Sequence, residues 1–446
     1  MIGNRRRVIL LAVVAVLVAG TRPVAAQDEM PRDPPATALR LSLDRALGEH
    51  AFLLGEVVRS GIGNLPDFNA AAAALEANTT DVVALIEDVY GADAADAFAE
   101  HWRNHVAYIV DYGRALADGD PDAAQLAQQQ LERYVDDFSG FLAEALPALA
   151  PDAVEGLIGG HVQQLEHVAS FEMGEVGEAY GAIRETYAHM FMVGDSLAEG
   201  IIGLHPNRFS GHEQAFSPAT TFRLELDRLL GEHTHLAAVY MRAMLRQEQD
   251  APSIGQALAG NTADLGAMIA DLYGAKAGEA FVRLWNDHVA TYTAYINGLA
   301  DGDDAATSAA IDELETYRSE FTDYLADANP HLSAAAFETL VGEHIEHLVA
   351  QAEAYAADRY DQSFEIGRQA YRHAGELARS LAGAIVDQFP HLLPNAATHA
   401  PPRDWGASLI PTVVLATGVL LVGLGVGLAI TRPSRIRRST SPRPQR

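Results

Sequence analysis

The amino-acid sequence predicts an all-α protein made of two tandem helical bundles, each of four to five helices, followed by one C-terminal transmembrane helix. Three observations lead to this fold class. Apolar residues recur every three or four positions, which is the period of a helix with one buried face. A long block of the sequence occurs twice at a fixed separation, and an uncharged apolar segment lies near the C-terminus.

The duplicated block is the strongest internal feature of the sequence. The segment Leu43–His50 returns as Leu226–His233, and many other matched positions share the same offset of 183 residues, which becomes 184 late in the second copy. This period is far longer than the roughly 20–50 residues of solenoid repeats. The sequence therefore predicts two separate bundle domains, at 37–206 and 220–391.

Local signals mark the helix boundaries within each copy. Asn78 and Asn261 are predicted as N-caps, because an asparagine side chain accepts hydrogen bonds from the first turn of a helix. The glycines after Tyr90 and Tyr273 are predicted to end the preceding helix. The helices expected in the first copy lie at 37–60, 79–89, 92–117, 121–146, 151–171 and 175–203. The proline-containing linkers are expected at 27–36, 205–219 and 390–403.

Residues 1–26 have the pattern of a secretory signal peptide. Three arginines precede a short apolar run, and Val24-Ala25-Ala26 resembles a cleavage site. The apolar run is shorter than the ~20 residues that a spanning helix needs. We therefore expect export and cleavage after Ala26, with an uncleaved N-terminal anchor as the alternative.

The C-terminal end predicts a membrane anchor. Residues 407–430 are uncharged and mainly apolar, and their length fits a helix that crosses a bilayer. Arginines are frequent in the tail at 431–446, and basic flanks stay on the cytoplasmic side of a membrane. We expect a single-pass protein of the cell membrane, with both bundles outside the cytoplasm and a juxtamembrane linker at 392–406.

The composition excludes several function classes. The chain has 60 acidic residues against 31 lysines and arginines, for a net charge of −29. Such a surface repels nucleic-acid backbones and attracts cations, so we expect no nucleic-acid partner. The chain has no cysteine, which excludes thiolate catalysis, zinc–thiolate sites and iron–sulfur clusters. The acidic ectodomain also has a simpler interpretation, as a solvated coat.

Histidines occupy inward positions of the predicted helices. In the first copy His50, His105 and His161 each fall on the apolar seam of a different helix. His189 lies one residue off the seam of a fourth helix, at the edge of the core. The second copy repeats all four positions, which gives eight candidate metal ligands: His50, His105, His161, His189, His233, His288, His344 and His373.

Converging imidazoles favour metal binding. A buried imidazole needs a hydrogen-bond partner or a metal, and several together cannot all be protonated at neutral pH. Imidazole suits a transition metal ion such as zinc, copper or iron, and bundles build metal sites from inward side chains. Glu49 and Glu232, each beside the first histidine of its copy, are candidate ligands or orienting groups. A ferritin-type di-iron site is disfavoured, because no acidic residue stands three positions before any of the first-copy histidines.

Two other interpretations stay open. In a metal-free core, each imidazole pairs with a carboxylate, a tyrosine or a carbonyl. The protein is then a structural or interaction protein of the cell envelope with an acidic surface, and its protein partner is not identified by the sequence. An enzyme that uses a histidine-bound metal is less favoured, because duplicated sites in isolated bundles suit binding better than turnover. The sequence also lacks a phosphate-binding loop, a nucleophile elbow and a His-Glu-x-x-His motif.

Each copy also contains an ordered series of short motifs: Leu-x-x-x-His, Asn-x-x-Asp, Tyr-Gly, a helix with His, then Pro and a further helix with His. The second copy has Leu229 and His233 in the first motif, whereas the first copy has Ala46 in place of the leucine. In this order each copy resembles a family of bacterial all-helical bundle proteins of unknown function. The resemblance implies a helical bundle and no particular reaction. The later motifs of the first copy are carried by Asn78, Asp81, Tyr90, Gly91, His105, Pro147 and His161.

Overall fold

The computed structural model describes residues 33–174 and 176–396, and every regular element in these ranges is an α-helix. The all-α prediction is confirmed for this part of the chain. None of the helices described there is long and apolar enough to cross a bilayer. The predicted signal peptide, transmembrane helix, cytoplasmic tail and most of the juxtamembrane linker lie outside the described residues, at 1–26, 407–430, 431–446 and 397–406.

Six long helices form each half of the described chain. The first half consists of α1 (Pro35–Ile62), α2 (Phe68–Tyr90), α3 (Ala92–Asp118), α4 (Pro121–Ala145), α5 (Pro151–Gly174) and α6 (Val176–Leu204). After the short α7 (His212–Ala215), the second half consists of α8 (Pro218–Arg246), α9 (Ala251–Tyr273), α10 (Ala275–Asp301), α11 (Asp304–Ala328), α12 (Ala334–Ala356) and α13 (Tyr360–Gln388). Each helix of the second half starts 183 residues after its counterpart, or 184 in the case of α13.

Most helix ends follow from local turn chemistry. Gly91 follows the last residue of α2 with a φ of 85°, as the predicted stop signal requires. Gly119 ends α3 in the left-handed conformation, with a φ of 66°. The next residue, Asp120, caps α4 because its carboxylate accepts a hydrogen bond from the Ala123 backbone N–H at 3.0 Å.

The start of α2 differs from the prediction. The helix begins at Phe68 and not near residue 79, because the alanine-rich segment before Asn78 is itself helical. Asn78 is buried inside α2, and its side-chain amide donates a hydrogen bond to the Ala46 carbonyl at 2.9 Å. Asn261 makes the equivalent bond from inside α9. These asparagines are therefore not N-caps. Each half of the described chain is a bundle of six long helices and not of four to five, because the short helix predicted at 79–89 is part of a long one.

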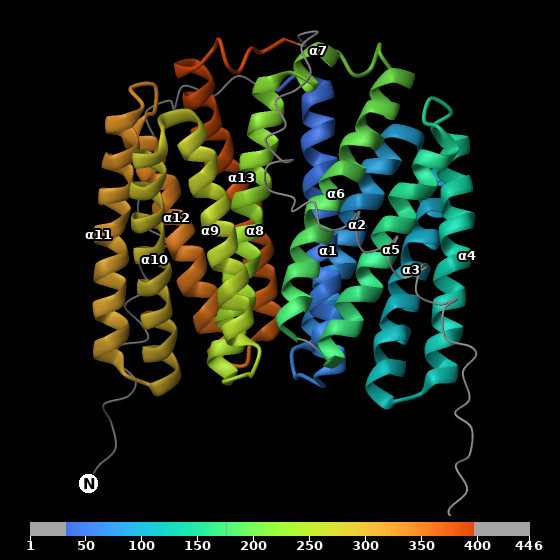
Figure 1. Cartoon of the computed structure of the whole chain (residues 1–446), viewed down its shortest axis with the longest axis horizontal. Coiled ribbons are helices and arrows are strands. Elements are labelled where there is room, and N and C mark those ends of the chain that lie inside the picture. Colours follow the sequence, from blue (N-terminus) through green and yellow to red (C-terminus); the bar gives the residue numbers. More distant parts are fainter. Residues whose placement is uncertain (1–32, 175, 397–446) are drawn as a thin grey trace, which may run out of the picture.

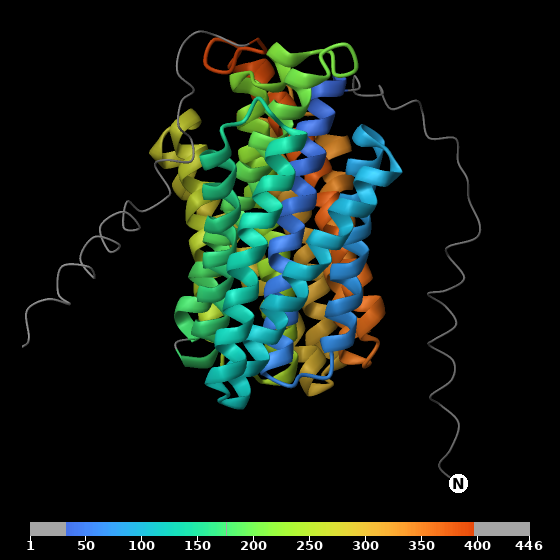
Figure 2. The same ribbon diagram turned by 90° about the vertical axis from the view of Figure 1, so that its right-hand side faces the viewer.

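The two halves lie side by side, and the axes of their helices are roughly aligned (Figure 1). The helices α1, α6, α8 and α13 lie in the middle, whereas α3 and α4 lie at one edge and α10 and α11 at the other. Figure 2 shows the same tall bundle from the side. The halves also overlap, because α2 packs against α13 and α9 packs against α6.

Buried ion pairs join the halves in a reciprocal pattern. Arg368 of α13 donates to both carboxylate oxygens of Glu49 in α1 at 3.0 Å, and to Asp81 at 2.6 Å. Its counterpart in the first half, Arg184 of α6, donates to Glu232 in α8 at 2.9 Å. Equivalent residues exchanging equivalent contacts indicate an approximate twofold axis between the halves.

Residues at equivalent positions meet on this axis. The hydroxyl oxygens of Tyr187 and Tyr371 are 3.3 Å apart. The rings of Phe52 and His235 stack, with centroids 4.7 Å apart. The interface between the halves is therefore a packed core with polar groups inside it, and the histidine seams of each half lie to either side of it.

Candidate metal centres

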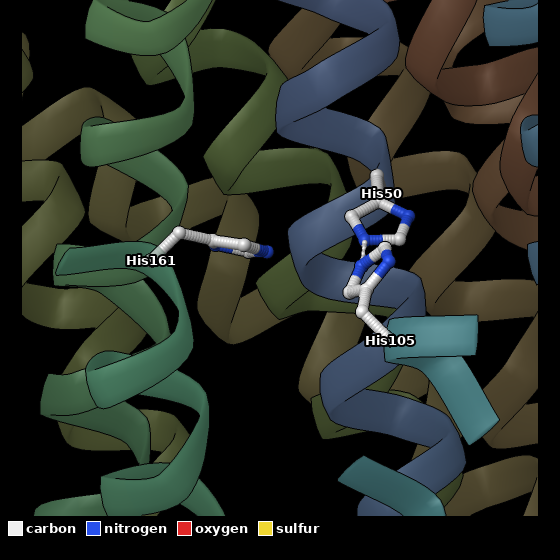
Figure 3. A group of neighbouring side chains, drawn as sticks. All are labelled: His50, His105 and His161. Atoms are coloured by element: carbon white, nitrogen blue, oxygen red, sulfur yellow. Dashed lines mark hydrogen bonds between the residues drawn. The ribbon is translucent and has the colours of Figure 1, made fainter. Parts of the chain in front are cut away.

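Three histidines of the first half converge from three helices. His50 lies on α1, His105 on α3 and His161 on α5, and one ring nitrogen of each lies within 4.8 Å of the others. Figure 3 shows the facing rings of His50 and His105, with His161 reaching toward them from α5. We call these three residues the first triad. All three side chains are buried.

The second half contains the equivalent group. His233 on α8, His288 on α10 and His344 on α12 also bring one ring nitrogen each within 4.8 Å of the others. We call these residues the second triad. His233 and His288 are buried, whereas His344 is partly exposed.

The closest nitrogens have the spacing of two ligands on one ion. The Nε2 atoms of His50 and His105 are 3.1 Å apart, and those of His233 and His288 are 3.4 Å apart. Two imidazole nitrogens bound to one tetrahedral zinc ion at ~2.0–2.1 Å are separated by about 3.3 Å. The third histidine of each triad has a ring nitrogen within 4.8 Å of these two. Each triad could therefore hold a metal ion.

Aromatic side chains pack against the triads. The Trp102 ring centroid lies 4.5 Å from that of His50, and Tyr134 of α4 stacks on His105 with centroids 5.0 Å apart. Tyr134 is not among the site residues predicted from the sequence. The duplication could have identified this residue, because Tyr317 stands 183 positions after Tyr134 and stacks on His288 of the second triad. These rings restrict the rotation of the imidazoles and keep water away from them.

Burial keeps the triad imidazoles neutral. It is the largest cause of the lowered pKa of every triad histidine, and it lowers the pKa of His105 and His288 to about 3. The neighbouring imidazoles of His105 and His161 lower the pKa of His50 further. A neutral imidazole offers a free lone pair, which is the form that binds a metal.

Several triad nitrogens lack a hydrogen-bond partner among the described residues. Both ring nitrogens of His161 are buried and unpaired in this part of the chain, as are Nδ1 of His50 and Nδ1 of His105. An unsatisfied buried polar group costs roughly 1–3 kcal/mol. A bound ion would satisfy one nitrogen of each ring.

The structure does not bring His189 and His373 into the triads. The Nε2 atom of His189 contacts the Leu157 carbonyl at 2.9 Å, and that of His373 contacts the Leu340 carbonyl at 2.8 Å. Both histidines therefore link the last helix of their half to the preceding one. Their proposed role as metal ligands stays a prediction from the sequence.

Glu49 precedes His50 and Glu232 precedes His233, but the side chains of these two glutamates point away from the triads. Glu49 accepts hydrogen bonds from Asn78 at 2.9 Å and from Arg368 across the interface. Glu232 accepts equivalent bonds from Asn261 and from an arginine of the first half. Neither belongs to a triad, because adjacent helical residues point about 100° apart. Each candidate site, within the described residues, thus offers three neutral nitrogens and no carboxylate.

Comparison with models of known protein families, with curated proteins and with solved structures gives no match.

Proposed function

We propose that this protein binds transition-metal ions, one in each half. The observation that carries the proposal is the convergence of three neutral imidazoles from three helices to within 4.8 Å, twice in one chain. The proposed ligands are His50, His105 and His161 in the first half, and His233, His288 and His344 in the second.

The ligand chemistry favours zinc, copper or iron. Imidazole nitrogen suits these ions, whereas magnesium and calcium prefer oxygen ligands, and none belongs to either triad. Three protein ligands leave one position of a tetrahedral site for water or another small ligand. The sites therefore resemble exchangeable or reactive sites more than closed structural ones.

The sequence supports a place for this binding outside the cytoplasm. The predicted signal peptide and C-terminal anchor favour a position of both halves at the outer side of the cell membrane. The acidic surface, with a net charge of −29 for the whole chain, raises the local concentration of cations. We infer a membrane-anchored protein of the cell envelope that binds metal ions from its surroundings.

Metal content of the purified full chain tests the proposal. We expect about two ions per chain after incubation with Zn²⁺, Cu²⁺ or Fe²⁺ and removal of free metal. Replacing the first triad by glutamine should leave about one ion, replacing the second triad should also leave one, and replacing both should leave none. Circular dichroism checks that each variant retains its helices.

Wild-type chain that retains none of the three ions would overturn the proposal. It would leave the alternative of a metal-free structural or interaction protein with an acidic surface. Metal bound with unchanged stoichiometry in the variant lacking both triads would also count against these ligands. In that case the acidic surface, and not the bundle cores, would hold the ions.

A further inference from the structure

The two halves differ in the space beside their triads. The second half contains a cavity of about 50 Å³ whose wall includes His233, His288 and His344. The corresponding cavity of the first half measures about 20 Å³, and His161 is the one member of the first triad in its wall. The second triad therefore opens onto free space with all three of its imidazoles.

The largest loss of side-chain volume between matched wall positions is at one residue. Met190 of α6 is buried in the wall of the smaller cavity, and the equivalent residue of α13 in the larger cavity is Ala374. Alanine lacks three heavy atoms of the methionine side chain. Val341 in place of Ile158 also removes volume, although Phe337 adds some elsewhere in the wall.

The cavity suits a small uncharged molecule. A cavity needs roughly 10–15 Å³ for one water-sized molecule, so about 50 Å³ accommodates a ligand of two or three heavy atoms. Its wall has no charged side chain and consists mainly of residues such as Leu226, Met268 and Phe281. A charged ligand would lose its hydration there without compensation.

Few polar atoms line the cavity besides the triad. The hydroxyl of Thr234 already donates to the Leu230 carbonyl at 2.9 Å. The indole Nε1 of Trp285 is buried and has no hydrogen-bond partner among the described residues. It is a donor available to a ligand in the cavity that carries a weak acceptor.

We propose that the second half binds an uncharged diatomic molecule of the class of dioxygen and nitric oxide. One atom occupies the open position of the metal held by the second triad, and the rest of the molecule fills the cavity beside Ala374. The inference rests on the proposed function, because it requires an ion in the second triad. The first half has less room for such a ligand, because its cavity measures about 20 Å³ and only His161 of its triad lies in the wall.

Nitric oxide binding to the iron-loaded full chain tests this inference. One variant keeps only the second triad and carries glutamine at all three positions of the first, and the matched variant keeps only the first. Both are loaded with Fe²⁺ without oxygen and titrated with nitric oxide, and the ferrous–nitrosyl complex is measured by electron paramagnetic resonance. We expect the second triad to bind nitric oxide about tenfold more tightly, or more, a difference of ~1.4 kcal/mol.

Exchanging the residues at the matched position sharpens the test. Ala374→Met in the chain that keeps the second triad should weaken nitric oxide binding to the level of the first triad. Met190→Ala in the other chain should strengthen it, and Met190→Leu, which retains most of the volume, serves as the control for stability. Iron content and helicity are measured for every variant, so that a folding defect is recognised.

The outcomes separate the two proposals. If both triads retain iron but bind nitric oxide equally, or if Ala374→Met changes nothing, the inference is overturned and metal binding stands. If neither triad retains iron, the inference is overturned, whereas the proposed function is overturned only if the chain retains neither zinc nor copper as well.

Discussion

The first and second halves share one plan of helices and one histidine triad, yet their surroundings have diverged. The second half has a larger cavity, and His344 is partly exposed where His161 is buried. The positions that the halves share include those that place imidazoles in the core. The residues that differ around the triads change the volume beside the imidazoles and the exposure of the third histidine.

The two equivalent buried carboxylates at the interface, Glu49 and Glu232, also differ in their surroundings. Glu232 pairs with Arg184 and also lies 3.9 Å from Arg228 in its own helix. Glu49 has Arg368 as its cation, because Arg45, the residue equivalent to Arg228, pairs instead with an aspartate of the second half. Glu232 therefore has a second arginine nearby, whereas among the described residues Glu49 has one arginine alone as its ion-pair partner.

The largest expected effect comes from removing that arginine. Arg368→Ala leaves the Glu49 carboxylate buried without its cation and should lower the free energy of unfolding by about 3–5 kcal/mol. Arg184→Ala should cost less, roughly 1–3 kcal/mol, because Arg228 remains near Glu232. Urea unfolding of the metal-free chain measures both.

Arg103→Ala is the control for this comparison. Arg103 forms an exposed pair with Glu76, so its loss should cost under about 1 kcal/mol. Equal losses for Arg368→Ala and Arg184→Ala would show that Arg228 contributes nothing.

The next largest effect is on the pH dependence of stability, and it comes from His235, which stacks on Phe52 at the axis between the halves. Burial, with the charges of Arg242 and Arg368, lowers the pKa of His235 to about 3, whereas Phe52 at the equivalent position cannot titrate. Below pH ~6.5 the unfolded chain binds a proton at His235 that the folded chain does not, so stability is lost as the pH falls from 6.5 toward 3. His235→Phe should therefore reduce the loss of stability between pH 7 and pH 5 by about 2 kcal/mol.

Chemical denaturation of the metal-free chain at several pH values measures this effect. His331→Gln, at an exposed position, removes a histidine without touching the interface and serves as the control. A pH dependence that is the same in His235→Phe and in wild type would mean that this imidazole becomes protonated without unfolding.

A smaller effect is expected at the fourth histidine of each half. His189→Leu and His373→Leu each remove a hydrogen bond to a backbone carbonyl, which should cost about 1 kcal/mol. Since these side chains lie outside the triads, both variants should retain about two metal ions per chain. Loss of one ion from either variant would indicate that the replaced histidine is a metal ligand.

The smallest effect concerns the rate of metal loading. His347, whose ring centroid lies 5.3 Å from that of His373, stands where the first half has Gln164. Glu343 lies 3.6 Å from Nδ1 of His373 and stands where the first half has Gly160. We expect these groups to bind an incoming ion weakly beside the second triad, so that this triad loads several-fold faster than the first.

Stopped-flow mixing of the single-triad chains with Zn²⁺ and a chromophoric indicator measures that rate. His347→Gln should slow loading of the second triad by a factor of a few, and the final metal content should not change. Equal rates for the two triads would mean that loading follows opening of the bundle and not this route.

The sequence by itself determined the helices, the duplication and the seam positions of the triads. Helix period and turn chemistry are local, so the inward faces of His50, His105 and His161 could be predicted from their neighbours in the chain. The same local rules failed at Asn78, because a buried asparagine that bonds to a carbonyl of another helix looks in sequence like an N-cap.

Only the tertiary structure decided which inward groups meet. The 4.8 Å grouping that includes His161 and leaves out His189 depends on the axial positions of α5 and α6 against α1. The pairing of Glu49 with Arg368 depends on packing between residues over 300 positions apart. Helix period fixes the direction in which a side chain points, but the distance to its partner depends on how separate helices pack, which no local pattern records.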